Sequence, residues 1–208
     1  MRRFTIPLMI ALFSPYLGCS DDGYPVKECR PGQGLALETD GVPVHGDTQA
    51  PVFLTVFGDL KCPYTQNFII ALDKFVERLE ADGKGAEFKW LFRHYVRPGY
   101  PQSTRIALAL AAAHMQGNDA FWRLFWLLFA TPEITDEYVL LYAEVAELDM
   151  EQFQADYESD DVRSVVANDD DLAREIGLGG TPGVVLCGKQ VTPVPDDVID
   201  NLEHLIYD

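Results

Sequence analysis

Four consecutive residues, Cys62-Pro63-Tyr64-Thr65, place a sulfur at the predicted start of a helix, directly after an apolar run that predicts a buried strand. At a helix N-terminus the backbone N–H groups lack partners and the helix dipole is positive, so both stabilise a thiolate. Cys62 is therefore a candidate nucleophile. Thr65 stands where a second cysteine would be needed to break, from within the motif, a mixed disulfide formed by Cys62.

A second motif, Gly180-Thr181-Pro182, precedes another apolar run much later in the chain. We expect a cis-proline loop here. The exposed backbone edge of such a loop can pair with an extended peptide. The candidate substrate-binding residues are therefore Pro63, Tyr64, Thr181 and Pro182.

The elements around the two motifs follow a definite order. Strands are expected at 35–39, 52–57 and 87–95, with a turn region between the first two and the helix from Cys62 between the last two. A helical block without a predicted strand covers about 100–176. A hairpin turning at Gly188-Lys189 and a helix over 196–206 complete the chain. This order predicts an α/β fold with a helical insertion.

From Val42 onward the chain resembles the DsbA-like family of extracytoplasmic thioredoxin-fold proteins. The resemblance rests on Ala50-Pro51-Val52, Phe57-Gly58-Asp59-Leu60-Lys61-Cys62-Pro63-Tyr64, Phe92-Arg93-His94-Tyr95 and Gly180-Thr181-Pro182. It implies a thioredoxin fold over 35–208, with the helical insertion between a β-α-β unit and a cis-proline β-β-α unit. It also implies a nucleophile at Cys62 and a substrate-facing Pro182. Family members usually carry a second cysteine where this chain has Thr65, so dithiol turnover does not carry over.

A single sulfur restricts the available chemistry to monothiol exchange. Cys62 can form a mixed disulfide with a polypeptide or small-molecule substrate, and an external reducing thiol must then release it. Thr65, the second candidate catalytic residue, lies one helical turn along, where its hydroxyl or backbone N–H can lower the pKa of Cys62. Lys61 adds a positive charge nearby. The alternative is a non-catalytic peptide-binding or chaperone-like module that has lost dithiol turnover. No cofactor is expected.

The N-terminus has the pattern of a targeting signal. Residues 1–18 combine a short basic start with an apolar stretch, which predicts a signal peptide. Cys19 follows in a context resembling a bacterial lipobox, so we expect lipidation there and a polar tether over 19–34. Cleavage by the ordinary signal peptidase is the alternative. Both routes place the body outside the cytoplasm, on the periplasmic side of a bacterial membrane, and lipidation would anchor it there.

Two further cysteines, Cys29 and Cys187, stand in the tether and at the end of the predicted cis-proline strand. Extracytoplasmic proteins retain disulfides, so Cys29 paired with Cys187 would staple the tether to the sheet and leave Cys62 free. Alternatively, Cys29 could act as a mobile resolving cysteine for Cys62.

The formal net charge of −17 argues against nucleic-acid partners. It indicates a solvated acidic surface or, alternatively, an acidic patch for basic substrates. No metal site is expected, because the histidines lack neighbouring ligands at metal-binding spacing. Asp169-Asp170-Asp171 is interpreted as a solvated helix face. His94 is interpreted as a structural residue, with a proton shuttle to Cys62 as the alternative.

Overall fold

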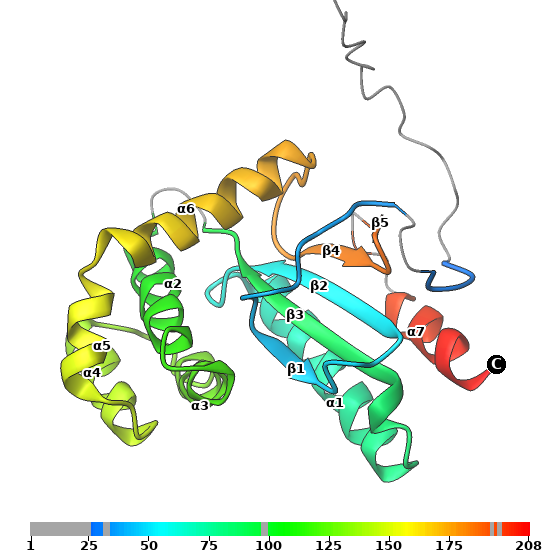
Figure 1. The fold of residues 1–208 in the computed structure, drawn as a ribbon, viewed down its shortest axis with the longest axis horizontal. Coiled ribbons are helices and arrows are strands. Elements are labelled where there is room, and N and C mark those ends of the chain that lie inside the picture. Colours follow the sequence, from blue (N-terminus) through cyan, green and yellow to red (C-terminus); the bar gives the residue numbers. More distant parts are fainter. Residues whose placement is uncertain (1–25, 31–33, 97–99, 192–193, 195–196) are drawn as a thin grey trace, which may run out of the picture.

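The computed structural model describes residues 26–30, 34–96, 100–191, 194 and 197–208. Its centre is a five-stranded sheet with the strand order β1-β3-β2-β4-β5 (Figure 1). The strands are β1 (Val44–Gly46), β2 (Val52–Gly58), β3 (Phe88–His94), β4 (Gly183–Leu186) and β5 (Lys189–Gln190). β2 and β3 are parallel, and the other neighbours are antiparallel. The apolar run of β2 is buried because this strand is central.

Helices α1 (Pro63–Ala81) and α7 (Val198–Tyr207) pack beside one another against the sheet (Figure 1). A short 3₁₀ turn, Gly85–Glu87, joins α1 to β3. The apolar stripe of α1 enters the core, where Leu72 and Phe75 are fully or almost fully buried. Lys84 links the ends of the two helices, since its ammonium donates to the Ile206 carbonyl at 2.9 Å.

Five helices lie between β3 and β4 and gather at one side of the sheet in Figure 1. They are α2 (Pro101–His114), α3 (Asn118–Phe129), α4 (Asp136–Val145), α5 (Met150–Tyr157) and α6 (Asp160–Glu175). The side chains of Thr135, Asp149 and Ser159 cap α4, α5 and α6 by accepting backbone N–H groups. The predicted α/β fold class, with a helical insertion between a β-α-β unit and a β-β-α unit, is confirmed.

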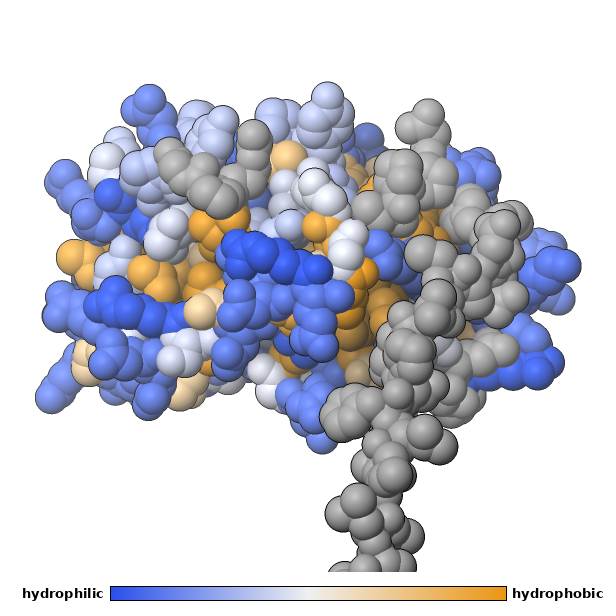
Figure 2. Space-filling model, turned by 90° about the horizontal axis from the view of Figure 1, so that it is seen from above, coloured by the Kyte–Doolittle hydropathy of each residue, from blue (hydrophilic) through white to orange (hydrophobic). Residues whose placement is uncertain are grey.

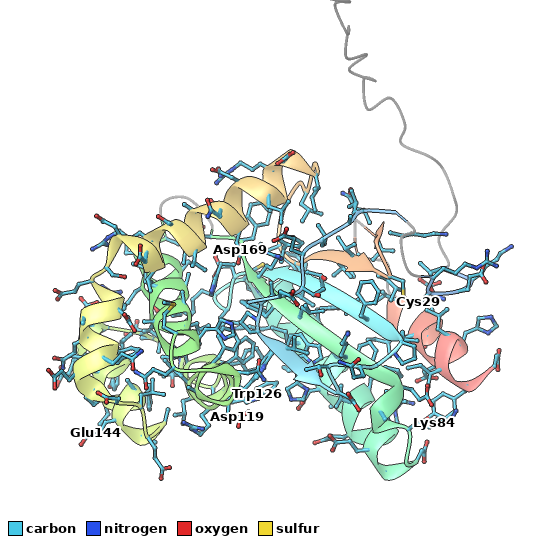
Figure 3. The ribbon with its side chains drawn as sticks, in the orientation of Figure 1. Cys29, Lys84, Asp119, Trp126, Glu144 and Asp169 are labelled. Carbon is cyan, nitrogen blue, oxygen red and sulfur yellow. A yellow bond between two sulfur atoms is a disulfide. The ribbon has the colours of Figure 1, made fainter. Side chains whose placement is uncertain are left out.

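Aromatic side chains attach the insertion to the sheet. Trp122 and Phe125 on α3 meet Trp90 and Phe92 on β3, with ring centroids 4.7 Å apart for Trp90–Trp122 and 5.2 Å for Phe92–Phe125. The interplanar angles of 62° and 76° are tilted to edge-on, which aromatic pairs favour. Trp126 lies on the same helix, at the border between insertion and sheet (Figure 3).

The acidic triplet on α6 is not a uniformly solvated face, so that interpretation was wrong for Asp169. This residue is 7% exposed and forms an ion pair with the Arg93 guanidinium at 2.5 Å. Its second carboxylate oxygen accepts the backbone N–H of His94 at 2.9 Å. Asp170 accepts the N–H of Val96 at 3.0 Å. The end of β3 thereby gains partners from α6 in addition to its pairing with β2, and Figure 3 shows Asp169 at this junction.

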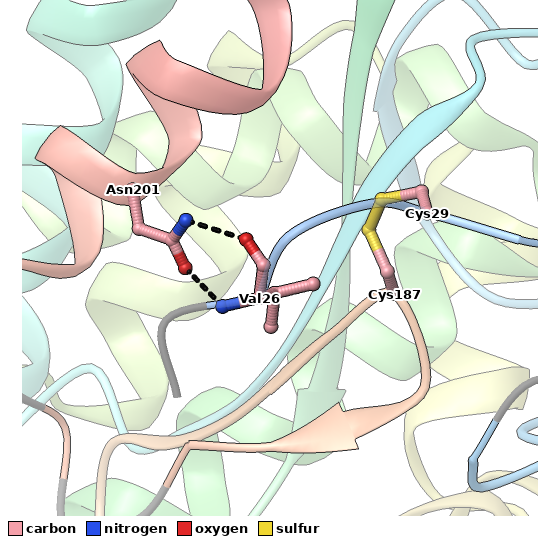
Figure 4. Close-up of a disulfide and its surroundings, with 4 residues drawn as sticks. All are labelled: Val26, Cys29, Cys187 and Asn201. Atoms are coloured by element: carbon pink, nitrogen blue, oxygen red, sulfur yellow. Dashed lines mark hydrogen bonds between the residues drawn. A yellow bond between two sulfur atoms is a disulfide. The ribbon is translucent and has the colours of Figure 1, made fainter. Parts of the chain in front are cut away.

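The folded body begins earlier than expected, because part of the predicted tether is docked. Val26 is 1% exposed, and its backbone N–H and C=O both bond to the side-chain amide of Asn201, each at 2.8 Å (Figure 4). Cys29 forms a disulfide with Cys187, with Cα atoms 5.1 Å apart. The disulfide is one of the two roles expected for Cys29, whereas the Val26–Asn201 pair was not expected, because the polar composition of 19–34 does not reveal a partner distant in sequence. The predicted signal peptide and Cys19 lie outside the described residues.

Two local predictions were also wrong. Residues 35–39 do not form a strand: the Leu35 N–H donates to the Gly188 carbonyl at 2.6 Å, but the Leu37 N–H turns back to the Leu35 carbonyl at 3.0 Å and no ladder continues. The edge strand lies instead at β1, within the expected turn region, where it pairs with β3. The β4–β5 hairpin turns at Cys187 and Gly188, whose φ angles are 49° and 77°. Two positive φ angles in a two-residue turn match the right-handed twist of the flanking strands. The turn therefore lies one residue earlier than the predicted turn at Gly188-Lys189.

The surface is dominated by hydrophilic residues on the face shown in Figure 2, with apolar residues gathered in patches between them. Among the described residues, no helix combines the length and the hydrophobicity needed to cross a membrane.

Candidate thiol site

Cys62 occupies the N-cap position of α1, immediately after β2. Its N–H donates to the Asp59 carbonyl at 2.9 Å, and its own carbonyl accepts the N–H of Gln66 at 3.0 Å. Pro63 fits the first helical position because a proline there loses no helical hydrogen bond. The turn is tightened by the Asp59 carboxylate, which accepts the Lys61 N–H at 2.8 Å. The sulfur is thus held at the helix start by backbone geometry.

The second motif meets the sulfur, although the two are 119 residues apart in the chain. The Cys62 thiol donates to the Thr181 carbonyl at 3.2 Å. The Thr181–Pro182 peptide bond is cis, as expected from the sequence. Cys62 is only 2% exposed, so the sulfur is covered and does not lie on an open surface. When the thiol loses its proton it can no longer donate to Thr181, so this contact belongs to the protonated state.

The pKa of Cys62 lies below its ordinary value. Burial acts to raise it, whereas hydrogen bonds involving the Thr181 and Thr65 side chains and the backbone N–H groups of Thr65 and Tyr64 lower it by more. The backbone donors are the unpaired N–H groups of the first turn of α1. A thiolate is therefore favoured by the cis-proline loop and the helix start together.

Thr65 lies under the sulfur and is completely buried. Its hydroxyl has no hydrogen-bond partner with good geometry in the described part of the chain, and Cys62 is the group whose pKa it affects. Its methyl group packs closely on the end of β2, since a Cβ added at Gly58 would lie 3.0 Å from Thr65 Cγ2. A buried hydroxyl without a strong partner is unusual, and here it faces a nucleophile.

A groove of about 850 Å³ runs beside the sulfur. Tyr64, Asn67 and Phe68 of α1 form one wall, and Val198 and Ile199 of α7 form the other. The loop 177–182, including Thr181 and Pro182, closes the end near Cys62. Tyr64 is 76% exposed at the rim, which leaves its ring available to a ligand. This volume lies within the range of ordinary ligand pockets.

Three of the four predicted substrate-binding residues line this groove, namely Tyr64, Thr181 and Pro182. Pro63 instead serves the helix start. The contributions of Asn67 and of α7 were not recognised in the sequence. The apolar face of α7 was visible there, but it gives no indication of which surface it meets.

Lys61 does not assist the sulfur in the way predicted. Its ammonium donates to the Thr131 carbonyl at 2.5 Å, so it ties the end of α3 to the site. Burial lowers the pKa of Lys61, with Asp59 acting in the opposite direction.

His94 is buried among Phe92 and Phe121, with ring centroids 5.7 and 6.5 Å away. Burial lowers its pKa, and it is not among the groups that shift the pKa of Cys62. These contacts favour its structural interpretation.

The disulfide between Cys29 and Cys187 leaves Cys62 as the one free cysteine among the described residues. Figure 4 shows this disulfide beside the Val26–Asn201 pair, so the two anchors act on the same segment. In the described ranges, no group of three or more His, Cys, Asp or Glu residues is arranged to hold a metal ion.

A sheet with this strand order, a thiol at the N-terminus of α1 and a cis-proline loop against it define a thioredoxin-fold thiol protein. The family model described as thioredoxin matches residues 38–204. The chain therefore belongs to the thioredoxin family, within its DsbA-like group.

Individual relatives are similar over most of the chain. It is 27% identical over 157 residues to "Probable disulfide bond formation protein D" of Bacillus cereus, covering 71% of each protein. The crystal structure of a thioredoxin-like oxidoreductase from Silicibacter pomeroyi has a TM-score of 0.59 at 28% identity, covering 71% of this chain and 80% of that one. Oxidised BdbD from Bacillus subtilis has a TM-score of 0.63 at 24% identity, covering 82% and 93%. The latter likeness supports the fold alone.

Proposed function

We propose that this protein performs monothiol exchange on extracytoplasmic polypeptides or small thiols, with Cys62 as its single nucleophile. The observation that carries the proposal is the contact of Cys62 Sγ with the Thr181 carbonyl, 3.2 Å, beside the groove. This contact places the free thiol of Cys62, whose pKa is lowered, next to the cis-proline loop, whose backbone edge can pair with an extended substrate. The relatives named for disulfide bond formation and oxidoreductase activity support thiol–disulfide chemistry in general, and the monothiol course is inferred from Thr65.

The reaction has two exchange steps. The Cys62 thiolate attacks one sulfur of a substrate disulfide, a new Cys62–substrate S–S bond forms, and the other substrate sulfur leaves as a thiolate that takes up a proton. An external thiolate then attacks the substrate sulfur of this mixed disulfide. Cys62 departs as a thiolate, which its lowered pKa favours, and the substrate leaves joined to the external sulfur. Thr65 cannot replace the external thiol, because a hydroxyl forms no disulfide.

Trapping tests this proposal. Extracytoplasmic extract is incubated with the full chain or with Cys62→Ser, and adducts are compared on non-reducing gels with and without added thiol. We expect the parent to form disulfide-linked adducts that Cys62→Ser does not form. Added thiol should reduce these adducts and release the bound protein. Adducts that persist in Cys62→Ser would contradict the assignment of the nucleophile.

A binding module without turnover is the second candidate. It is favoured by the 2% exposure of Cys62, because an attacking sulfur must be reached by its substrate. Peptides that bind equally well to the parent and to Cys62→Ser, without forming adducts, would support it.

We also propose that residues 1–18 are removed and that Cys19 is lipidated, which places the body at the periplasmic side of a bacterial membrane. The polar run after Cys19 supports a tether between the lipid and the folded body. The disulfide of Cys29 with Cys187 supports an oxidising location. Labelling of cells with an alkyne-bearing fatty acid, with Cys19→Ala as the control, tests the anchor. Label retained in Cys19→Ala would refute it.

A further inference from the structure

The groove beside Cys62 has an unusual electrostatic composition for a chain rich in carboxylates. None of its described lining residues is charged. Its polar side chains are neutral, from Tyr64, Asn67, Thr181 and Gln190. The formal charge of the whole chain is −17. A ligand that enters the groove therefore leaves water without meeting a cationic side chain among these residues.

The helix dipoles do not compensate for the lack of cationic side chains among the described lining residues of the groove. The first N–H groups of α1 are already directed at the Cys62 sulfur. At α7, whose first residues line the other wall, Asp197 occupies the N-cap position and Asp200 lies in the first turn. Asp200 thus offsets part of the positive charge at that helix end. An entering carboxylate would bear the cost of desolvation with no cationic side chain among the described lining residues, and the net negative charge of the chain would repel it.

We propose that the thiol that releases Cys62 from its mixed disulfide is neutral or cationic, as on an uncharged or basic polypeptide, and not an anionic small thiol such as glutathione. This inference rests on the monothiol exchange proposed above. Chemically, the incoming thiolate attacks the substrate sulfur, and Cys62 leaves as a thiolate with the bonding electron pair. In this proposal the incoming molecule approaches through the groove, because the Thr181 end of the groove adjoins the Cys62 sulfur, and its charge therefore affects the rate.

The experiment measures release from a defined adduct. The purified full chain is converted to a Cys62 mixed disulfide with an uncharged, end-blocked cysteine peptide. Peptide release is followed by acid quenching and mass spectrometry with cysteamine, 2-mercaptoethanol, 3-mercaptopropionate and glutathione. Each rate is divided by that of the same thiol on the disulfide of the same peptide with N-acetylcysteine amide. The quotient removes differences in thiol pKa and nucleophilicity.

We expect the corrected rates for cysteamine and 2-mercaptoethanol to exceed those for the two anionic thiols by roughly tenfold at low salt. Added salt should narrow this gap, because it screens charge. Corrected rates for glutathione and 3-mercaptopropionate equal to or above that of 2-mercaptoethanol would overturn the inference.

Two matched variants separate the groove from the overall charge. Asn67→Lys places a cation in the groove wall, whereas Gln154→Lys makes the same change of charge on exposed α5, outside the groove lining. We expect Asn67→Lys to raise the anionic-to-neutral rate ratio at least about threefold and Gln154→Lys to leave that ratio unchanged. An equal effect of both variants would refute a role for the groove.

The proposed function fails separately, if Cys62 forms no mixed disulfide with any disulfide reagent. Adduct formation without charge discrimination would instead overturn only the inference about the releasing thiol.

Discussion

Replacing Thr65 by valine should stabilise the fold and weaken the nucleophile at the same time. Thr65 is 0% exposed and, among the described residues, its hydroxyl has no well-formed hydrogen bond, so below the pKa of Cys62, where no thiolate can accept from it, the folded state carries an unpaired polar group. Burying such a hydroxyl costs about 1–3 kcal/mol in proteins. Valine has nearly the same shape, and we expect it to raise the free energy of unfolding by about 1 kcal/mol.

The effect on Cys62 has the opposite direction. The Thr65 hydroxyl is one of the groups that lower the pKa of Cys62, so Thr65→Val should raise that pKa. A hydrogen bond worth about 0.7–1.4 kcal/mol corresponds to a roughly threefold to tenfold slower alkylation at neutral pH. The backbone donors from Tyr64 and Thr65 remain, so reactivity should not disappear.

Urea unfolding and the pH dependence of iodoacetamide alkylation measure the two effects. Ser103→Ala is the matched control, because Ser103 is 4% exposed and also carries a buried hydroxyl without a partner, on α2. It should gain stability without any change at Cys62. A Thr65→Val protein that is less stable, or whose alkylation profile matches the parent, would refute this account of the hydroxyl.

The lowered pKa of Cys62 also sets a pH dependence of stability. Between the folded pKa and the unfolded value of about 8.5, the unfolded chain binds the proton and the folded chain does not. Stability from this group therefore rises with pH through that window and is lost as pH falls through the folded pKa. The difference in unfolding free energy between the parent and Cys62→Ser should increase with pH there, and a flat difference would argue against an activated thiol.

Three further predictions follow from the described contacts. Thr65→Cys should form an internal disulfide, because positions one and four of a helix start lie on the same side, and this disulfide should oxidise a reduced dithiol peptide without added small thiol while becoming a dithiol itself; an internal disulfide that oxidises no peptide would favour the binding module. Asn201→Leu should lower the free energy of unfolding by about 2–3 kcal/mol in urea, since it leaves the buried N–H and C=O of Val26 unpaired; a loss below about 0.5 kcal/mol would show that the segment does not depend on this pair. Burial lowers the pKa of His94, so its imidazole stays neutral in the folded state while the same group takes up a proton in the unfolded chain below about pH 6.5. The free energy of unfolding should therefore fall as the pH drops below that value. His94→Gln should reduce the dependence of the melting temperature on pH, and an unchanged dependence would exclude His94 as its source.

Short-range features of this chain could be predicted from sequence because their causes are local. The apolar run of β2, the one-sided stripe of α1 and the caps of α4 to α6 depend on residues within a few positions of one another. The nucleophile at Cys62 could be predicted for the same reason, since a helix start activates its own N-cap. The cis-proline loop was recognised from a short motif, and its place opposite Cys62 followed from resemblance.

Tertiary structure alone decided the features whose energy comes from contacts between distant residues. Val26 enters the core because Asn201, 175 positions away, satisfies its backbone. Asp169 is buried because Arg93 and the end of β3 supply its partners, whereas composition suggested a solvated face. The edge strand formed at β1 and not at 35–39 because only the former meets β3. Backbone and carboxylate groups take whichever partner the fold supplies on burial, and sequence patterns record the need for a partner without identifying it.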